Sequence, residues 1–220
     1  MTDWQLMNKN PIIRWVCREY RHAFHALHPE SRRKSASWHN TEGPEFLLQI
    51  GVNPGDTVLD FGCGPGCFCL PAARVVGDHG WVYAVDKNPR VLRQVRRQAA
   101  AFNLPNLRTA ASLSAAAAQL NGQTCNFIMI YDMLHFLDAP DRRVLYAGAR
   151  GLLAEKGRLS VHLKHVKGDE PGRFFAEMTA DEVAREIEMA GFCLFQKIPA
   201  RIWHSYAAVE SMVWNFIKRE

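Results

Sequence analysis

Short apolar runs alternate with amphipathic stretches from residue 57 to about residue 200, and this alternation constrains the fold more than any other feature. The first run, Thr57–Phe61, is bounded by turn residues, which is typical of a buried strand. Stretches of helical periodicity follow most of the runs. Repeated strand–helix units of this kind predict a mostly parallel sheet that is covered by helices on both faces.

The apolar runs predict seven strands, over residues 57–61, 81–85, 107–110, 126–131, 157–163, 192–197 and 205–216. The amphipathic stretches predict helices over residues 65–76, 89–103, 114–120, 140–153 and 179–190. Only a short connection separates the last two strands, so they are expected to pair antiparallel. The predicted fold class is therefore α/β, a Rossmann-like seven-stranded, mostly parallel sheet with one antiparallel strand.

The first 45 residues differ from the rest, because they hold clustered basic residues and histidines without strand-like alternation. Apolar residues at spacings of three and four predict a helix over residues 11–28 that stops at Pro29. Residues 31–35 are expected to form an exposed loop, and residues 43–50 a second helix. We therefore expect a helical extension or lid over residues 1–45, followed by a single domain over residues 46–220.

A glycine-rich loop follows the first strand, with the sequence Asp60-Phe61-Gly62-Cys63-Gly64-Pro65-Gly66. Ligands of open α/β sheets bind beyond the carboxyl ends of the strands, and glycine lets the backbone approach a ligand closely. The pattern is G-x-G-x-G, and Asp60 before it favours a cationic partner. Asp86 closes the next strand, where a carboxylate can accept both hydroxyls of a ribose.

These residues carry a family resemblance. Val58–Gly66 and Val82–Asp86 resemble the first two motifs of the class I S-adenosylmethionine-dependent methyltransferases. Residues 126–138 are similar to the fourth-strand motif of that family, and residues 152–159 to the segment that leads into its fifth strand. The resemblance covers roughly residues 44–200. It implies an enzyme that takes its methyl group from S-adenosylmethionine as cofactor.

The resemblance also implies a set of cofactor-binding residues: Asp60, Gly62, Cys63, Gly64, Gly66, Asp86, Lys87, Ser112 and Tyr131. One departure affects this set. Many family members carry an acid after the third strand that recognises the adenine amino group, whereas this chain has Ala110-Ala111-Ser112-Leu113. Ser112 or backbone groups are left to recognise the adenine.

Methyl transfer from a sulfonium is an in-line displacement, so the enzyme mainly supplies positioning and desolvation, with a base where the acceptor carries a proton. Asp132, at the end of the fourth strand, and His135, about one turn later, are the expected catalytic residues. Two plainer roles stay open: His135 capping a helix, and Asp132 binding the amino group of the cofactor.

Other polar and aromatic residues at the expected site are secondary candidates. His162, Lys164 and His165 follow the fifth strand, where alternation places the first two on one face and His165 on the other. Trp38 in the N-terminal segment is expected either to cover an apolar substrate or to pack on the edge of the sheet.

The six cysteines are expected to be reduced thiols, because they are too few and too irregular for a disulfide-stapled scaffold. Cys67, near a helix start, is a candidate reactive thiol. Arsenite methyltransferases carry a cysteine near the position of Cys69, but Asp132 stands where that branch needs another thiol, so tight packing beside the cofactor is the preferred interpretation. No metal site is expected.

The net charge of +5 raises the question of nucleic acid. No aromatic platform for single strands accompanies the basic residues, so a solvated surface is the preferred reading. The expected partner is a small-molecule substrate, with neither nucleic acid nor membrane, and a homodimer stays open. The absence of a secretory signal and of a long apolar stretch predicts a cytoplasmic location. Two alternatives remain: an RNA or protein methyltransferase, and a catalytically silent cofactor-binding regulator.

Overall fold

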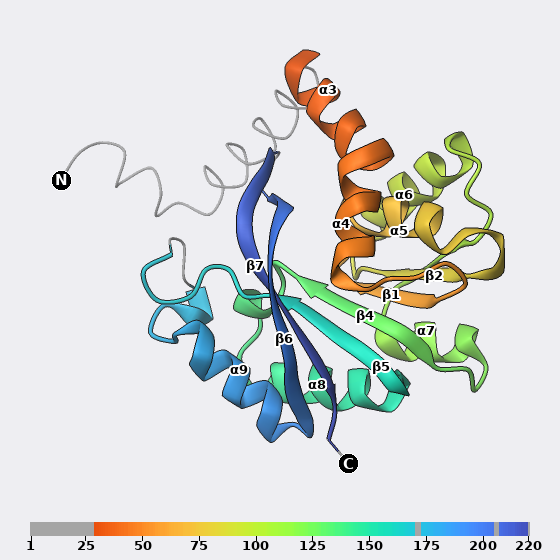
Figure 1. Ribbon diagram of the computed structural model, residues 1–220. Helices are drawn as coiled ribbons and strands as arrows, with labels where there is room; N and C mark the ends of the chain where they lie inside the picture. The colour runs from red at the N-terminus through yellow and green to blue at the C-terminus, as the bar shows by residue number, and fades with distance from the viewer. Residues whose placement is uncertain (1–28, 170–172, 205–206, 220) are drawn as a thin grey trace.

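The computed structural model describes residues 29–169, 173–204 and 207–219. Seven strands form one sheet in the order β3-β2-β1-β4-β5-β7-β6 (Figure 1). The strands are β1 Thr57–Phe61, β2 Trp81–Val85, β3 Leu107–Ala110, β4 Cys125–Tyr131, β5 Leu153–His162, β6 Phe192–His204 and β7 Ala207–Lys218. Pairing is parallel from β3 to β5, and β7 runs antiparallel to both of its neighbours. The predicted fold class is confirmed.

Helices cover both faces of this sheet. Three of them, α4, α5 and α6, pack with one side of the strands into a first core, and α7, α8 and α9 pack into a second core on the opposite side (Figure 1). The helices are α3 Pro29–Ser37, η1 Trp38–Glu42, α4 Gly43–Ile50, α5 Cys69–Val76, η2 Gly77–His79, α6 Pro89–Ala101, α7 Leu113–Leu120, η3 Leu134–Phe136, α8 Ala139–Leu152, η4 Arg173–Phe175 and α9 Ala180–Met189.

The N-terminal part of the described chain is more helical than the sequence predicts. The exposed loop expected over residues 31–35 is wrong, because α3 occupies residues 29–37 and Lys34 pairs with Glu30 one turn earlier at 2.8 Å. The described part of this helix starts at Pro29. The helix expected over residues 11–28 lies outside the described residues.

Two further boundaries differ from expectation. Helix α5 begins at Cys69 and not at Pro65, because residues 62–68 are used by the turns of the glycine loop. Strand β6 continues to His204, well past the predicted end at residue 197. Pro199 interrupts the strand pattern in the sequence, but β6 lies at the edge of the sheet, where a missing backbone N–H is tolerated.

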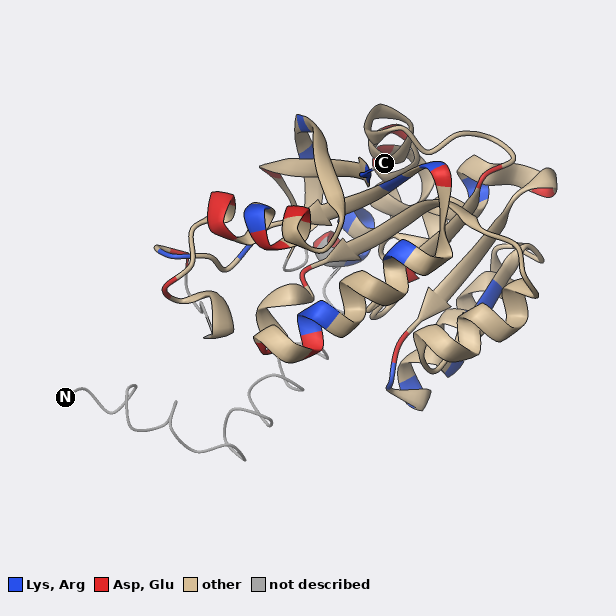
Figure 2. Cartoon of the chain, turned by 90° about the horizontal axis from the view of Figure 1, so that it is seen from below, with Lys and Arg blue, Asp and Glu red and all other residues tan. Residues whose placement is uncertain are grey.

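The charged residues are spread over several elements. Figure 2 shows blue and red segments next to one another on the same helices. Helix α6 keeps its arginines exposed, at Arg90, Arg93, Arg96 and Arg97. Among the residues that the structure describes, no helix combines the length and the apolar character that a membrane span requires.

Candidate active site

The glycine loop leaves β1 at the carboxyl edge of the sheet and is fixed to the end of β2. The backbone N–H groups of Gly62 and Cys63 both donate to the carbonyl of Val85, at 2.8 and 3.0 Å. Gly62 has a φ of +79°, and a Cβ there would lie 2.1 Å from the side chain of Met133. Only glycine therefore fits this turn, which brings the loop against the residue that follows Asp132.

Asp60 is a buried acid with an unsatisfied oxygen. Its side chain lies under the loop at 1% exposure, where the backbone N–H of Cys69 donates to the carboxylate. The second oxygen, Oδ2, has no hydrogen-bond partner among the described residues. Burial, with a smaller contribution from the charge of Asp86, raises the pKa of Asp60 to about 7. A buried carboxylate oxygen without a donor is a ready acceptor for a cationic group that enters the loop.

Asp86 joins the glycine loop to the start of α6. One carboxylate oxygen accepts from the N–H of Gly64 at 3.2 Å, and the other accepts from the N–H of Asn88 at 2.8 Å. The side chain is half-buried at the carboxyl end of β2. This arrangement orients the carboxylate beside the loop and leaves it in reach of a ligand.

Asp132 holds two histidines at the same edge of the sheet. Its Oδ1 lies 3.0 Å from Nδ1 of His162, and its Oδ2 lies 2.7 Å from Nδ1 of His204. Nε2 of His162 in turn lies 2.9 Å from the hydroxyl of Ser211. Burial alone would raise the pKa of the Asp132 carboxyl, but the hydrogen bonds and charge of the two histidines hold it well below its usual range. The carboxylate is therefore ionised whenever the protein is folded near neutral pH.

Asp132 also has an unusual backbone. Its φ is +53°, a region that residues other than glycine enter at an energetic cost. The chain accepts this conformation directly after β4, and the result is a carboxylate placed between His162 and His204. Backbone strain of this kind concentrates at functional sites.

His135 and His165 extend the cluster. His135 lies in η3 and is buried, and its ring packs 4.3 Å from the ring of His165, which lies 5.3 Å from the ring of His204. Lys164 pairs with Asp169 at 2.8 Å. Strand β5 ends at His162, so the strand-like alternation of side chains does not continue to Lys164 and His165, and the faces expected for these two residues do not apply.

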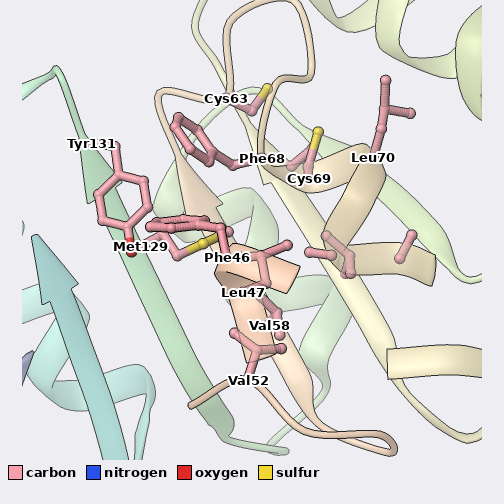
Figure 3. Close-up of a cluster of buried hydrophobic side chains, with 14 of the residues drawn as sticks. Phe46, Leu47, Val52, Val58, Cys63, Phe68, Cys69, Leu70, Met129 and Tyr131 are labelled. Atoms are coloured by element: carbon pink, nitrogen blue, oxygen red, sulfur yellow. The ribbon is translucent and has the colours of Figure 1, made fainter. Parts of the chain in front are cut away.

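Aromatic side chains lie between the helices and this edge of the sheet. Trp38 is fully buried, and its ring centroid lies 5.6–5.9 Å from those of Phe46, Phe68 and Trp203. Its Nε1 donates to the carbonyl of Cys67 at 2.6 Å. Figure 3 shows Phe46 and Phe68 gathered beside Tyr131 from β4. Of the two roles expected for Trp38, the buried packing role is the one that these contacts match.

The segment that forms this edge of the sheet is similar to a known protein family. Residues 58–157, which include the glycine loop, Asp86 and Asp132, match the methyltransferase domain family model. By this match the segment is a methyltransferase domain. Its expected methyl donor is S-adenosylmethionine, which the resemblance of its motifs implies.

Curated relatives match parts of the chain. The probable cobalt-precorrin-6B C(15)-methyltransferase (decarboxylating) of Saccharolobus solfataricus is 38% identical over 60 residues, which cover 27% of this chain and 30% of that protein. The aklanonic acid methyltransferase of Streptomyces sp. (strain C5) is 33% identical over 82 residues, or 34% of this chain and 37% of that protein. The chain thus spans about a third of the length of these relatives.

Solved structures extend the likeness to nearly the whole fold. A SAM-dependent methyltransferase from Aquifex aeolicus superposes with a TM-score of 0.64 at 19% identity, covering 85% of this chain and 95% of that one. This likeness concerns the fold, and it covers more of the chain than residues 58–157 that match the family model.

The residues of the methyltransferase domain fit S-adenosylmethionine. The unpartnered, buried Oδ2 of Asp60 suits the ammonium group of a methionine moiety. At Gly64 a Cβ would find only one atom within 4 Å, the carbonyl oxygen of Gly62 at 3.9 Å, so the loop backbone is open on that side. Asp86, beside this opening, is a suitable acceptor for hydroxyl groups.

The other residues implied by the family resemblance are less directly placed. The side chain of Ser112 accepts from the N–H of Ala115 and so begins α7 as its N-cap. Lys87 is exposed, and the hydroxyl of Tyr131 is bound to that of Ser160 at 2.7 Å. Ser112 thus has a structural role as the N-cap of α7. Its contact with the adenine stays a proposal.

The cysteines beside the glycine loop are packing residues. The structure describes five of the six, and all five are free thiols. Cys67, which was only a candidate reactive thiol, is not activated, because burial raises its pKa to about 12 and keeps it protonated. The residue precedes α5 by two positions, so it does not gain the stabilisation of a helix N-terminus.

Sequence reasoning did not identify His204 or Ser211 as site residues. His204 lies 72 residues beyond Asp132, and Ser211 lies 49 beyond His162, in strands whose pattern shows no link to the fourth. A histidine at the end of an edge strand was the only available signal. The long antiparallel pairing of β6 with β7, which extends to His204 and Ala207, brings both residues to the site.

Proposed function

We propose that the protein transfers a methyl group from S-adenosylmethionine to a small-molecule acceptor. The observation that carries this proposal is the position of two groups at one carboxyl edge of the sheet. The glycine loop with Asp60 forms one end, and Asp132 with its two histidines forms the other, joined by Met133 against Gly62. The names of the relatives, which act on a precorrin and on aklanonic acid, support a small-molecule acceptor.

At the cofactor end, the bound S-adenosylmethionine supplies an electrophilic methyl group. Asp60 receives the ammonium group at its free Oδ2, and Asp86 receives the ribose hydroxyls beside the N–H of Gly64. Both carboxylates are anchored by backbone N–H groups, so they need little reorganisation when the ligand arrives.

At the acceptor end, Asp132 and His135 are the proposed catalytic residues. Asp132 keeps His162 and His204 in fixed orientations, and His135 lies against His165 at the rim of the same cluster. Imidazole groups held in this way can orient an acceptor and take up its proton.

Calorimetric titration with S-adenosylmethionine tests the cofactor end. The native protein is expected to bind one equivalent, and Asp86→Ala is expected to weaken binding at least about tenfold, since the ribose loses a charge-assisted hydrogen-bond acceptor. Asp78→Ala is the matched control, because Asp78 is an exposed acid in η2. Absence of binding by the native protein at millimolar ligand would rule out the proposal.

The acceptor end is tested by separating binding from turnover. Asp132→Asn and His135→Ala are expected to keep the native affinity for S-adenosylmethionine within about twofold and to lower kcat at least about a hundredfold. Methyl transfer is measured with radiolabelled donor against a panel of small molecules, bulk tRNA and protein. Labelling of the tRNA or the protein alone would favour the macromolecular alternatives, and equal kcat values in the variants would contradict the catalytic roles.

A further inference from the structure

Three side chains with metal-binding atoms meet at the acceptor end of the site. Asp132 follows β4, His162 ends β5 and His204 ends β6, and their ligand atoms all lie within 4.8 Å of one another. We propose that Asp132, His162 and His204 bind a divalent transition-metal ion that holds the methyl acceptor. This inference rests on the proposed function, because it assigns the ion to the acceptor end of that site.

Two of the distances between ligand atoms lie near those of a shared ion, and any wider separation, up to 4.8 Å, has to shorten when the ion binds. Neighbouring ligands of one ion with bonds of about 2.1 Å lie roughly 3.0–3.4 Å apart. The Asp132 oxygens lie 3.0 Å from Nδ1 of His162 and 2.7 Å from Nδ1 of His204. An ion can therefore replace the two hydrogen bonds after the ligands move, with each Nδ1 releasing any proton it carries and giving its lone pair to the ion.

Ser211 is not a proposed ligand, but its contact with His162 supports the same arrangement. Metal-binding histidines usually bond through the other ring nitrogen to an oxygen that fixes the ring. Nε2 of His162 lies 2.9 Å from the hydroxyl of Ser211 on β7, and a hydroxyl can donate to this nitrogen or accept from it. His162 is thus held in a suitable orientation for either tautomer.

The strained backbone of Asp132 is a second, independent indication. A φ of +53° directs the carboxylate between two histidines that come from different strands. A plain structural ion pair needs only one of them. The strain is understandable if the carboxylate must occupy a fixed place in a three-ligand site.

The donor set indicates the kind of ion and the kind of acceptor. Two imidazoles and one carboxylate suit zinc, iron(II) or cobalt(II), whereas magnesium and calcium prefer oxygen ligands. Three protein ligands leave at least one coordination position open. An acceptor with a hydroxyl or thiol group can fill that position, and coordination then makes its proton easier to lose.

Cobalt(II) is the probe for this site, because its visible absorption reports on its ligands. The full-length protein is stripped of metal with a chelator and titrated with cobalt(II). We expect saturation at one equivalent, with Asp132→Asn and His204→Gln each weakening binding at least tenfold. His79→Gln is the matched control, since His79 is an exposed histidine in η2 and should leave the titration unchanged.

Calorimetry with S-adenosylmethionine on the same metal-free samples separates the two hypotheses and confirms that the variants are folded. Should His204→Gln lose cofactor binding, Ser211→Ala is the milder variant, with an expected three- to tenfold loss in cobalt(II) affinity. Native protein that binds the cofactor but no cobalt(II), or variants that bind cobalt(II) like the native protein, would overturn the metal site and leave the proposed function standing. Cobalt(II) binding without cofactor binding would support the metal site and contradict the proposed function.

Discussion

Asp60→Asn is expected to stabilise the cofactor-free protein by about 1–3 kcal/mol at pH 8. The pKa of Asp60 rises to about 7 in the fold because burial disfavours the carboxylate. Each pH unit by which folding raises the pKa of an acid corresponds to about 1.4 kcal/mol lost once the acid ionises. Asparagine keeps an oxygen for the N–H of Cys69 and carries no charge, so it avoids this loss. Its amide N–H groups, however, take the place of the unpartnered Oδ2 and offset about 1–3 kcal/mol of the gain.

The sign follows from the direction of the shift. The folded-state pKa is above that of the unfolded chain, so the contribution of Asp60 to stability is fully present below about pH 4. It is lost as the pH rises towards 7 and changes little above that. Urea unfolding of the native protein and of Asp60→Asn at pH 4.5 and pH 8 measures this, with Asp78→Asn as the exposed control. Equal stabilities of the native protein and Asp60→Asn at pH 8 would show that the buried oxygen is not an unpaired charge.

The same substitution is expected to remove most of the affinity for S-adenosylmethionine. The carboxylate must be ionised to receive the ammonium group, so native affinity should rise about tenfold between pH 5.5 and pH 7. The Asp60→Asn variant should lack this dependence. A variant that binds the cofactor as tightly as the native protein would place the ammonium group elsewhere.

The cofactor end of the site could be predicted from the sequence because its parts are local. Asp60 and the glycines occupy seven consecutive residues, and Asp86 closes the next strand of a parallel sheet, so both must reach one edge. The structure adds what local sequence cannot contain, namely that Oδ2 of Asp60 has no partner. That property depends on the packing of α5 over the loop.

The acceptor end was only partly predictable because it depends on tertiary contacts. Asp132 and His162 follow neighbouring strands and could be anticipated at the edge, whereas His204 arrives through an antiparallel hairpin whose length the sequence underestimates. For Cys67, in contrast, the local sequence suggested a role that the tertiary structure does not support. Its place near a predicted helix start made it a candidate reactive thiol, but burial raises its pKa.

The N-terminal helices should be essential to the stability of this site, and Trp38→Ala is expected to destabilise the protein by about 3–5 kcal/mol. Trp38 is fully buried between Phe68 and Trp203, and its Nε1 satisfies the carbonyl of Cys67 in the glycine loop. Alanine leaves a large cavity at this contact and an unpaired carbonyl in the loop.

Trp38→Phe separates the two contributions. Phenylalanine retains most of the ring packing and loses only the hydrogen bond to Cys67, so the expected loss is about 1–2 kcal/mol. Urea denaturation of the native protein and both variants measures the difference, and Leu48→Ala, at a half-exposed residue of α4, gives the comparison for removal of an apolar side chain near the surface. A loss below 1 kcal/mol for Trp38→Ala would mean that η1 separates from the domain without disturbing it. We expect the larger loss because Trp38 packs against Trp203, which precedes His204 in β6. The N-terminal helices thereby help to position His204 beside Asp132.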